Sequence, residues 1–372
     1  MRTVRVELGD RAYEVRIGAG ALAGSADALR TVIGRGQPTI IADETVWGLH
    51  EPALRKVLPN APVLTVPSGE ASKSFAQYER LTEGLLAAGV GRDGTVVAFG
   101  GGVTGDLAGF CAATLRRGCR FVQLPTTLLA MVDSSVGGKT AINAGAGKNL
   151  VGAFHQPSLV VADTEFLATL PEREVRAGMA EVVKAAILRG PETLRPITDW
   201  CARAFYGEPP DGPGYDPNGL AALIRDAVAL KANIVARDER EGGVRALLNF
   251  GHTFGHAVEA IYGYDGRVLH GEAVGLGMAM AARFAAREGL CDRDAAGEVE
   301  RMVVTARLPM HAGALPPEPG LTPAAFLAGM AQDKKVEAGA LTLVLPHAIG
   351  DVRVHKGVEM SPLRGFLEDE LP

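Results

Sequence analysis

Residues 246–272 read ALLNFGHTFGHAVEAIYGYDGRVLHGE and contain three of the chain's eight histidines. His252 and His256 are four residues apart, a spacing that places two side chains on one face of a helix. His270 follows a turn-like break at 262–267 and begins a second helical run. Two helices that meet across such a turn can direct their imidazoles at one point. The stretch therefore predicts two adjacent helices that carry a candidate metal site.

A carboxylate would complete this site as the third ligand and leave one coordination position open. Glu181, within a predicted helix at 172–188, is the best candidate. A histidine pair on a helix is often only a hydrogen-bonded face, and spacing alone leaves that alternative open. Zinc peptidases carry HExxH, with a glutamate directly after the first histidine. Thr253 occupies that place here, which disfavours a peptidase.

The composition is that of an ordinary globular protein, with 47% hydrophobic and 22% charged residues. A length of 372 residues is enough for two domains. The net charge of −5 and the lack of a basic block disfavour nucleic acid as a partner. The four cysteines are scattered without a CxxC pair, which fits reduced thiols. We find no apolar signal core and no run that could span a bilayer, so we expect a cytoplasmic protein without a membrane partner.

The periodicity of the chain changes near Leu170 and Pro171, where we predict a domain boundary. Before this point strands alternate with helices, the pattern of a parallel α/β sheet. The predicted strands are 3–8, 13–17, 38–42, 61–66, 94–99 and 120–124, and the predicted helices are 21–32, 75–88 and 107–115. After it the predicted helices are 172–188, 220–237, 246–261, 270–288 and 295–306. We also expect an exposed loop at 207–219 and a late strand at 341–345.

The fold class that follows is α/β, with an N-terminal parallel-sheet dinucleotide-binding domain at 1–170 and an all-helical metal-binding domain at 171–372. The dinucleotide prediction rests on Gly100, Gly102 and Gly105, which fit GxGxxG between a strand and a helix. Backbone amides at such a turn can approach a pyrophosphate, and Asp43 at a strand end could bind ribose hydroxyls. A tight strand–helix turn is the alternative. The acidic residue normally follows the glycines, whereas Asp43 precedes them.

The run PTTLLAMVDSSVGGKTAINAGAGK at 125–148 places hydroxyl and ammonium groups around a glycine pair, and such a loop offers an anion several donors. Gly138-Lys139-Thr140 resembles part of a P-loop, but Asp133 replaces the first glycine of GxxxxGK[ST]. A nucleoside-triphosphatase is therefore disfavoured.

Further cations could serve a polyanionic substrate. Glu181 and Lys184 are three residues apart on one predicted helix face, a spacing for which a surface ion pair is the default interpretation. Upstream of His252 lie Lys231, Arg245 and Asn249. Taken singly, each of these lysines could equally be a solvated surface residue without a role in substrate binding.

Seven blocks in order make the chain similar to the 3-dehydroquinate synthase family. They are GGGVTGD at 100–106, LPTTLLAMVDSSVGGKTAIN at 124–143, GKNLVGAFHQP at 147–157, LPEREVRAGMAEVVK at 170–184, DEREGGVRALLNFGHTFGHA at 238–257, LHGEAVGLGM at 269–278 and DKK at 333–335. The resemblance covers nearly the whole chain and is weakest at 195–219.

This resemblance implies an NAD-binding domain at 1–170, a helical metal- and substrate-binding domain at 171–372, a cleft between them and a homodimer. It implies one divalent metal, zinc or alternatively cobalt, held by Glu181, His252 and His270. The implied NAD contacts are Asp43, Glu70, Lys73, Gly100, Gly101, Gly102, Val103, Thr104, Gly105, Asp106, Thr126, Thr127, Lys139 and Lys148. The implied catalytic positions are Asp133, Lys184, Lys231, Arg245, Asn249 and His256. The implied substrate-binding positions are Arg117, Lys139, Asn149 and one of Lys334 and Lys335, with Arg117 reaching the substrate of the partner subunit.

The implied reaction converts 3-deoxy-D-arabino-heptulosonate 7-phosphate to 3-dehydroquinate and phosphate, a step of the shikimate pathway of aromatic amino acid biosynthesis. NAD takes hydride from a ring carbinol whose hydroxyl the metal acidifies. Phosphate leaves by β-elimination, hydride returns, and an intramolecular aldol step closes the ring. The net reaction is a lyase reaction. His256 is the implied proton relay.

Three alternatives remain open. Other sugar phosphate cyclases share the metal and NAD chemistry but act on substrates without a carboxylate. A metal-dependent polyol dehydrogenase of related fold would release NADH, and the Lys139 loop argues against it. A catalytically silent dinucleotide-binding or scaffold protein is disfavoured because every implied ligand position is filled.

Overall fold

The computed structural model describes residues 1–207, 217–333 and 341–371. The chain forms two compact units, the first of Met1–Val175 and Pro217–Arg240, the second of Arg176–Asp216 and Glu241–Pro372. The predicted boundary near Leu170 lies close to the first of these divisions. A single boundary does not describe the units, however, because α8 (Pro217–Arg237) groups with the first unit. No helix among the described residues has the length and apolar character needed to cross a membrane.

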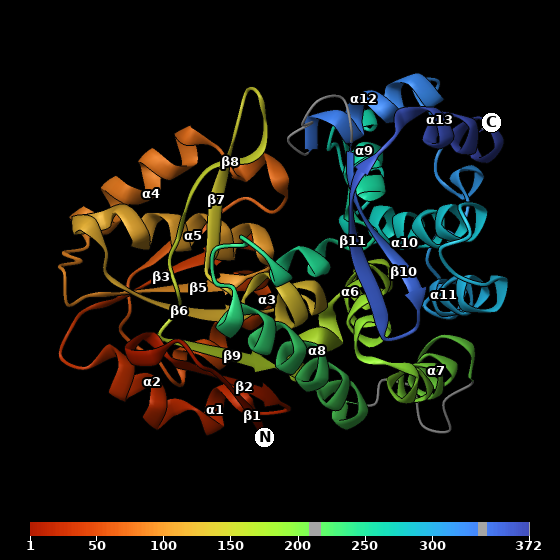
Figure 1. Cartoon of the computed structure of the whole chain (residues 1–372). Helices are drawn as coiled ribbons and strands as arrows, with labels where there is room; N and C mark the ends of the chain where they lie inside the picture. The colour runs from red at the N-terminus through yellow and green to blue at the C-terminus, as the bar shows by residue number, and fades with distance from the viewer. Residues whose placement is uncertain (208–216, 334–340, 372) are drawn as a thin grey trace. The chain divides into compact units, whose positions relative to one another are not determined.

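The first unit is built on a parallel sheet whose order is β1-β2-β9-β6-β5-β3-β4 (Figure 1). Its strands are β1 (Arg2–Val6), β2 (Tyr13–Gly18), β3 (Pro38–Asp43), β4 (Val63–Val66), β5 (Thr95–Gly100), β6 (Arg120–Pro125) and β9 (Leu159–Asp163). β1 pairs with β2 in the antiparallel sense, and every other pairing in this sheet is parallel. The predicted α/β class with a parallel sheet is confirmed.

Helices cover both faces of this sheet. They are α1 (Ala21–Gly24), α2 (Ala26–Ile33), α3 (Glu44–Arg55), α4 (Phe75–Ala87), α5 (Gly102–Thr114) and α8. Successive residues of a strand point to opposite faces, so Ile40 packs in one hydrophobic core and Ile41 in the other. The first core includes residues of α2 and α3, and the second includes residues of α4 and α5. A sheet buried on both faces explains why its strands read as apolar runs in the sequence.

The run at 125–148 is more ordered than a loop. It contains a π-helical turn at Ala130–Ser134 and then a hairpin of β7 (Lys139–Ala144) and β8 (Gly147–Phe154). β7 packs against α4 and α5 of the same unit. The apolar residues Leu128, Met131 and Val132 are buried, and the turn packs against α5 and α8.

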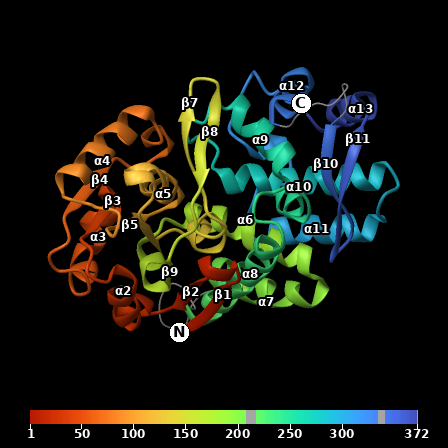
Figure 2. The ribbon, with the colours of Figure 1, turned by 60° about the vertical axis from the view of Figure 1, so that its left-hand side comes forward.

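The second unit is helical, as predicted, with one added hairpin (Figures 1 and 2). Its helices are α6 (Glu172–Arg189), α7 (Leu194–Cys201), α9 (His252–Ile261), α10 (His270–Arg287), α11 (Arg293–Thr305), α12 (Pro323–Asp333) and α13 (Met360–Glu370). The late strand expected at 341–345 is β10 (Leu341–Ala348), which pairs with β11 (Asp351–Val358). The description of this part as all-helical is therefore corrected. Most of the loop expected at 207–219 lies outside the described residues.

Candidate metal centre and dinucleotide turn

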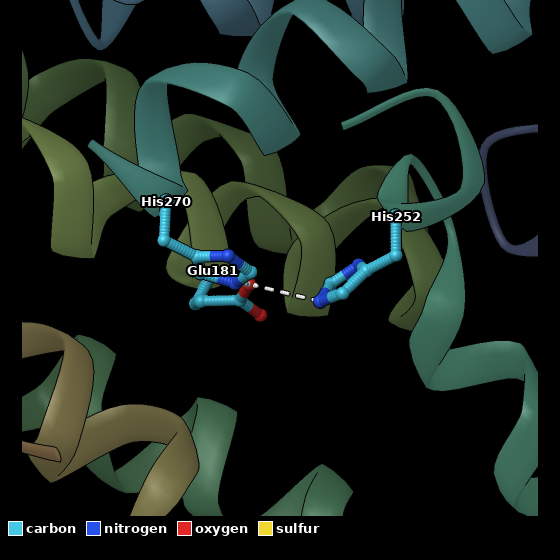
Figure 3. A group of neighbouring side chains, drawn as sticks. All are labelled: Glu181, His252 and His270. Atoms are coloured by element: carbon cyan, nitrogen blue, oxygen red, sulfur yellow. Dashed lines mark ion pairs between the residues drawn. The ribbon is translucent and has the colours of Figure 1, made fainter. Parts of the chain in front are cut away.

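Glu181, His252 and His270 converge at one point of the second unit, as the sequence predicts (Figure 3). His252 Nε2 lies 3.6 Å and His270 Nε2 lies 3.7 Å from Glu181 Oε1. One candidate ligand atom from each of the three residues lies within 4.8 Å of the others. Two imidazoles and a carboxylate from three helices form the donor set typical of a catalytic zinc site.

Close helix packing brings these side chains together. His252 is the first residue of α9, directly after Gly251 in a left-handed conformation with φ 79°. A Cβ on Gly277 of α10 would lie 2.0 Å from the carbonyl oxygen of Gly251. A Cβ on Gly271 would lie 1.9 Å from the carbonyl oxygen of Ala177 in α6. The backbones approach so closely because both positions lack a side chain.

The carboxylate of Glu181 lies in an environment suited to a cation. Glu181 is 2% exposed and forms an ion pair with Lys184, which is 3% exposed. The default interpretation of these two residues as a surface ion pair is wrong, because both side chains are buried. Among the described residues, none donates a hydrogen bond of ordinary geometry to either oxygen of Glu181. A buried carboxylate without such donors is costly, and a divalent cation would satisfy it.

The two imidazoles have opposite protonation tendencies in this structure. Burial holds the pKa of His252 well below its usual range, and the charge of Lys184 adds to this effect. Burial also favours the neutral form of His270, but Glu259 and Glu181 outweigh it and raise its pKa to about 10. The carboxylates of Glu259 and Glu181 therefore create a negative electrostatic potential at His270, which favours a positive charge there.

The other predicted residues of the second unit lie close to these ligands in sequence and differ in their contacts. The ring of His256 is centred 5.3 Å from that of His252 and 6.1 Å from that of His270. Arg245 is buried, and Asn249 donates a hydrogen bond of 2.9 Å to Glu241. Sequence reasoning missed Glu241 and also Glu259, which lies 3.0 Å from His270. For Glu259 the signal was its position seven residues after His252, on the same face of a helix.

In the first unit, the glycine turn and Asp43 lie at neighbouring strand ends. β3 and β5 pair in parallel, and a Cβ on Gly100 would lie 3.1 Å from Cβ of Asp43. Strand adjacency thus explains why the acidic residue can precede the glycines in sequence. Asp43 Oδ1 accepts hydrogen bonds from the amides of Thr45 and Val46 and from Ser68 Oγ at 2.7 Å. Its carboxylate also caps α3 in this structure.

Small side chains and hydroxyls surround this turn. A Cβ on Gly101 would lie 3.0 Å from Thr127 Cγ2, and one on Gly102 would lie 3.0 Å from Ser134 Oγ. The amide of Thr126 donates to the carbonyl of Gly100 at 3.0 Å. Thr126 Oγ1 is buried and has no hydrogen-bond partner within the part of the chain that the structure describes. A buried hydroxyl of this kind beside the glycine turn fits the binding of a polar ligand. The predicted dinucleotide residues Val103, Thr104 and Gly105 lie in the first turn of α5, directly after this glycine turn.

A second polar group of the first unit is centred on the buried Lys73. Its ammonium group donates to Asp106 at 2.6 Å and to Asn149. Burial raises the pKa of Asp106, and the charge of Lys73 opposes this rise. Glu70 lies 3.8 Å from Lys73 and accepts a hydrogen bond of 2.8 Å from Asn143. The predicted dinucleotide residues Glu70, Lys73 and Asp106 are therefore neighbours.

The remaining predicted residues of the first unit are more dispersed. Lys231 donates to the side chain of Asp133 at 2.9 Å and to its carbonyl at 2.6 Å. Lys139 and Lys148 lie on opposite strands of the β7–β8 hairpin. Arg117 belongs to a turn where its φ is 70°, an uncommon conformation for a residue other than glycine. Lys334 and Lys335 lie outside the described residues.

Comparisons with known proteins cover nearly the whole chain. Residues 63–177 match the family described as 3-dehydroquinate synthase N-terminal, and residues 178–336 match 3-dehydroquinate synthase C-terminal. The 3-dehydroquinate synthase of Paracoccus denitrificans is 48% identical over 98% of this chain and 98% of its own. The 3-dehydroquinate synthase of Caulobacter vibrioides is 46% identical over 100% of this chain and 99% of its own.

Solved structures show the same fold. The 2-epi-5-epi-valiolone synthase of Streptomyces hygroscopicus, with NAD⁺ and Zn²⁺ bound, has a TM-score of 0.84 and 28% identity over 99% of this chain and 98% of its own. A 2-deoxy-scyllo-inosose synthase complexed with carbaglucose-6-phosphate, NAD⁺ and Co²⁺ has a TM-score of 0.82 and 26% identity over 100% of both chains. These matches cover the turn of the first unit and the three converging side chains of the second. The chain belongs to the 3-dehydroquinate synthase family.

Proposed function

We propose that this chain is a 3-dehydroquinate synthase, a phosphate-eliminating carbon–oxygen lyase of the shikimate pathway. Its substrate would be 3-deoxy-D-arabino-heptulosonate 7-phosphate, and its products 3-dehydroquinate and phosphate. The observation that carries the proposal is the convergence of Glu181, His252 and His270 in a chain nearly half identical to curated members of this family.

The proposed cofactors are NAD and one divalent metal ion, Zn²⁺ or Co²⁺. Glu181, His252 and His270 would hold the ion, and the burial of the Glu181 carboxylate beside both imidazoles supports this choice. When bound, the ion would supply Lewis-acid polarisation of a substrate hydroxyl, and NAD would accept and return a hydride. NAD would bind at the glycine turn next to Asp43 and Thr126, together with the group around Lys73.

The chain's own residues would then bind and orient the substrate. Lys139, Asn149 and Arg117 would hold its phosphate, and Lys231 with one of Lys334 and Lys335 would hold its carboxylate. Lys231 already binds Asp133, so the substrate carboxylate would share or displace this contact. Asp133, Lys184, Arg245 and Asn249 would complete the polar lining. His256 would hold a proton next to the oxidised hydroxyl, because its ring adjoins those of both histidine ligands.

Phosphate release tests this function against its alternatives. We expect the purified protein with NAD and Zn²⁺ to release inorganic phosphate from the seven-carbon sugar acid phosphate without accumulating NADH. Glucose 6-phosphate, which lacks the carboxylate, is the matched control and should give no phosphate. Release from the control alone would favour another sugar phosphate cyclase. Stoichiometric NADH would favour a polyol dehydrogenase.

Two further parts of the proposal concern the state of the protein. We propose a homodimer in which Arg117 reaches the phosphate of the partner subunit's substrate, and its uncommon backbone conformation supports a functional role. We also propose a cytoplasmic location. The buried thiols of Cys111, Cys119 and Cys201 are free, as expected in a reducing compartment. Light scattering of the purified protein tests the dimer.

A further inference from the structure

Glu259 is a buried acidic residue to which neither the sequence motifs nor the proposed function gives a role. It lies on α9 and is 5% exposed. Its Oε2 atom is 3.0 Å from Nδ1 of His270, the first residue of α10. Burying a carboxylate is costly unless a partner compensates for it. The His270 contact provides such a partner, and it is directed at a candidate metal ligand.

The two nitrogens of His270 face different carboxylates. Nδ1 contacts Glu259, and Nε2 lies 3.7 Å from Glu181. A carboxylate only accepts hydrogen bonds, so it holds a proton on Nδ1. The lone pair of the neutral ring is then on Nε2, the nitrogen that faces Glu181 and the candidate ion position. Without Glu259, the ring could exchange tautomers or rotate.

His252 shows the same arrangement with a different acceptor. Its Nδ1 atom lies 3.2 Å from the carbonyl oxygen of Phe250, and its Nε2 atom faces Glu181. Both histidines therefore have an acceptor at Nδ1 and present Nε2 to the same carboxylate. Such outer contacts commonly fix the tautomer and orientation of histidine ligands.

Helix packing holds Glu259 in place. A Cβ on Gly255, one turn before Glu259, would lie 3.0 Å from the carbonyl oxygen of Ala273 in α10. α9 and α10 are therefore closely packed near His270. Glu259 also follows His252 by two turns of helix, which places both side chains on the same face.

We propose that Glu259 is a positioning residue that fixes the tautomer and orientation of His270 for a divalent cation. This inference rests on the proposed function, because it assumes an ion held by Glu181, His252 and His270. The competing arrangement uses His256, Glu259 and His270, whose candidate ligand atoms also lie within 4.8 Å of one another. In that arrangement Glu259 would bind the ion directly.

The test is the affinity for Zn²⁺ and Co²⁺ without substrate, measured by competition with a chromophoric chelator. Removing such an outer contact typically weakens metal binding by about 10–100-fold. We expect a loss of this size for Glu259→Ala and a smaller loss for Glu259→Gln, whose amide oxygen can still accept from Nδ1. Both should bind one ion per chain at saturation, with a Co²⁺ visible spectrum that keeps its tetrahedral intensity. Glu300→Gln removes a carboxylate paired with Arg283 at 2.7 Å and is the matched control with unchanged affinity.

The outcomes separate this inference from the function on which it rests. If the unaltered protein binds no ion, the proposed function fails. If the unaltered protein binds one ion and both Glu259 variants bind it with the same affinity as the unaltered protein, only the role of Glu259 is refuted. If binding requires His256 and Glu259 but tolerates His252→Ala, the ion occupies the competing arrangement, and the positioning role is refuted. Should Glu259→Ala not fold, Glu259→Gln decides alone, and an affinity equal to that of the unaltered protein contradicts the role.

Discussion

Two groups of histidines in the second unit have the same chemical parts and opposite surroundings. His252, His256 and His270 lie next to the buried carboxylates of Glu181 and Glu259. On the β10–β11 hairpin, His347 and His355 contact each other, with their Nε2 atoms 2.9 Å apart and their rings inclined by 11°. Within the described part of the chain, this second pair belongs to no group of three or more potential ligands.

The difference teaches that the neighbours of an imidazole decide its role. Glu259 and Glu181 raise the pKa of His270 to about 10 against the effect of burial. Burial lowers the pKa of His355, and the charges of His347 and Arg353 lower it further. The hairpin pair therefore favours a neutral ring that hydrogen-bonds to its neighbour. The helical group favours a positive charge, which an ion could supply.

The largest effect should come from removing a candidate metal ligand of the helical group. We expect His270→Ala and Glu181→Gln to leave a folded protein that binds little metal and loses activity by on the order of a thousandfold, because several kcal/mol of charge stabilisation are lost. Metal content by mass spectrometry and phosphate release measure this. The double variant His347→Asn/His355→Asn is the control and should keep its metal. Full activity of His270→Ala or Glu181→Gln without bound metal would show that the helical group does not differ from the hairpin pair in metal binding.

A smaller effect should come from the packing that assembles the helical group. In Gly271→Ala, the new Cβ would clash with the carbonyl oxygen of Ala177, so α6 and α10 must separate. We expect a loss of about 1–3 kcal/mol in the free energy of unfolding, together with weaker metal binding. Gly297→Ala is the matched control in α11, because no atom of the described residues outside this helix turn lies within 4 Å of the added atom. It should stabilise the protein by up to about 1 kcal/mol. Thermal unfolding that ranks the two variants equally would contradict the packing argument.

The smallest effect concerns the hairpin pair and pH. The pKa of His355 is lower in the folded protein than in the unfolded chain, so the unfolded chain gains the proton first as pH falls. The stability that His355 contributes is thus present above about pH 6.5 and is lost at lower pH. We expect His355→Gln to reduce the fall in Tm between pH 7.5 and pH 5.5 by about 1–2 °C. His311→Gln, at an exposed position, is the control. A fall as large as in the unaltered protein would show that the pair does not titrate as described.

Much of the fold was predictable because periodicity is a local signal. The predicted strands of the first unit and the beginning of α10 at His270 agree with the structure, whereas α3 and β9 were missed. The assignment of α8 to the first unit was not predictable, because it depends on contacts between residues far apart in the sequence. The π-helical turn at Ala130–Ser134 and the β7–β8 hairpin were also missed, since glycines and hydroxyls there resemble a loop.

The convergence of the three candidate metal ligands was predictable because two of them share one short stretch. Glu181 could be chosen only as a carboxylate on another helix, and its ion pair with Lys184 read as a surface feature until burial was known. Glu259 has no motif of its own, because its role depends on which nitrogen of His270 it contacts. Orientation of this kind is set by helix packing, which residue spacing does not encode.

The grouping of α8 with the first unit has a consequence for synthesis on the ribosome. α8 packs against β1 and β2, and β1 is an edge strand of the sheet. A nascent chain that has released only its first 175 residues therefore has every strand of the sheet but lacks the helix that packs against this edge strand. Until α8 has emerged, this edge strand lacks its packing partner, and an exposed edge strand can pair with other chains. Expression of a fragment ending at the first division should accordingly yield aggregates, and a fragment for biochemical work would have to include α8.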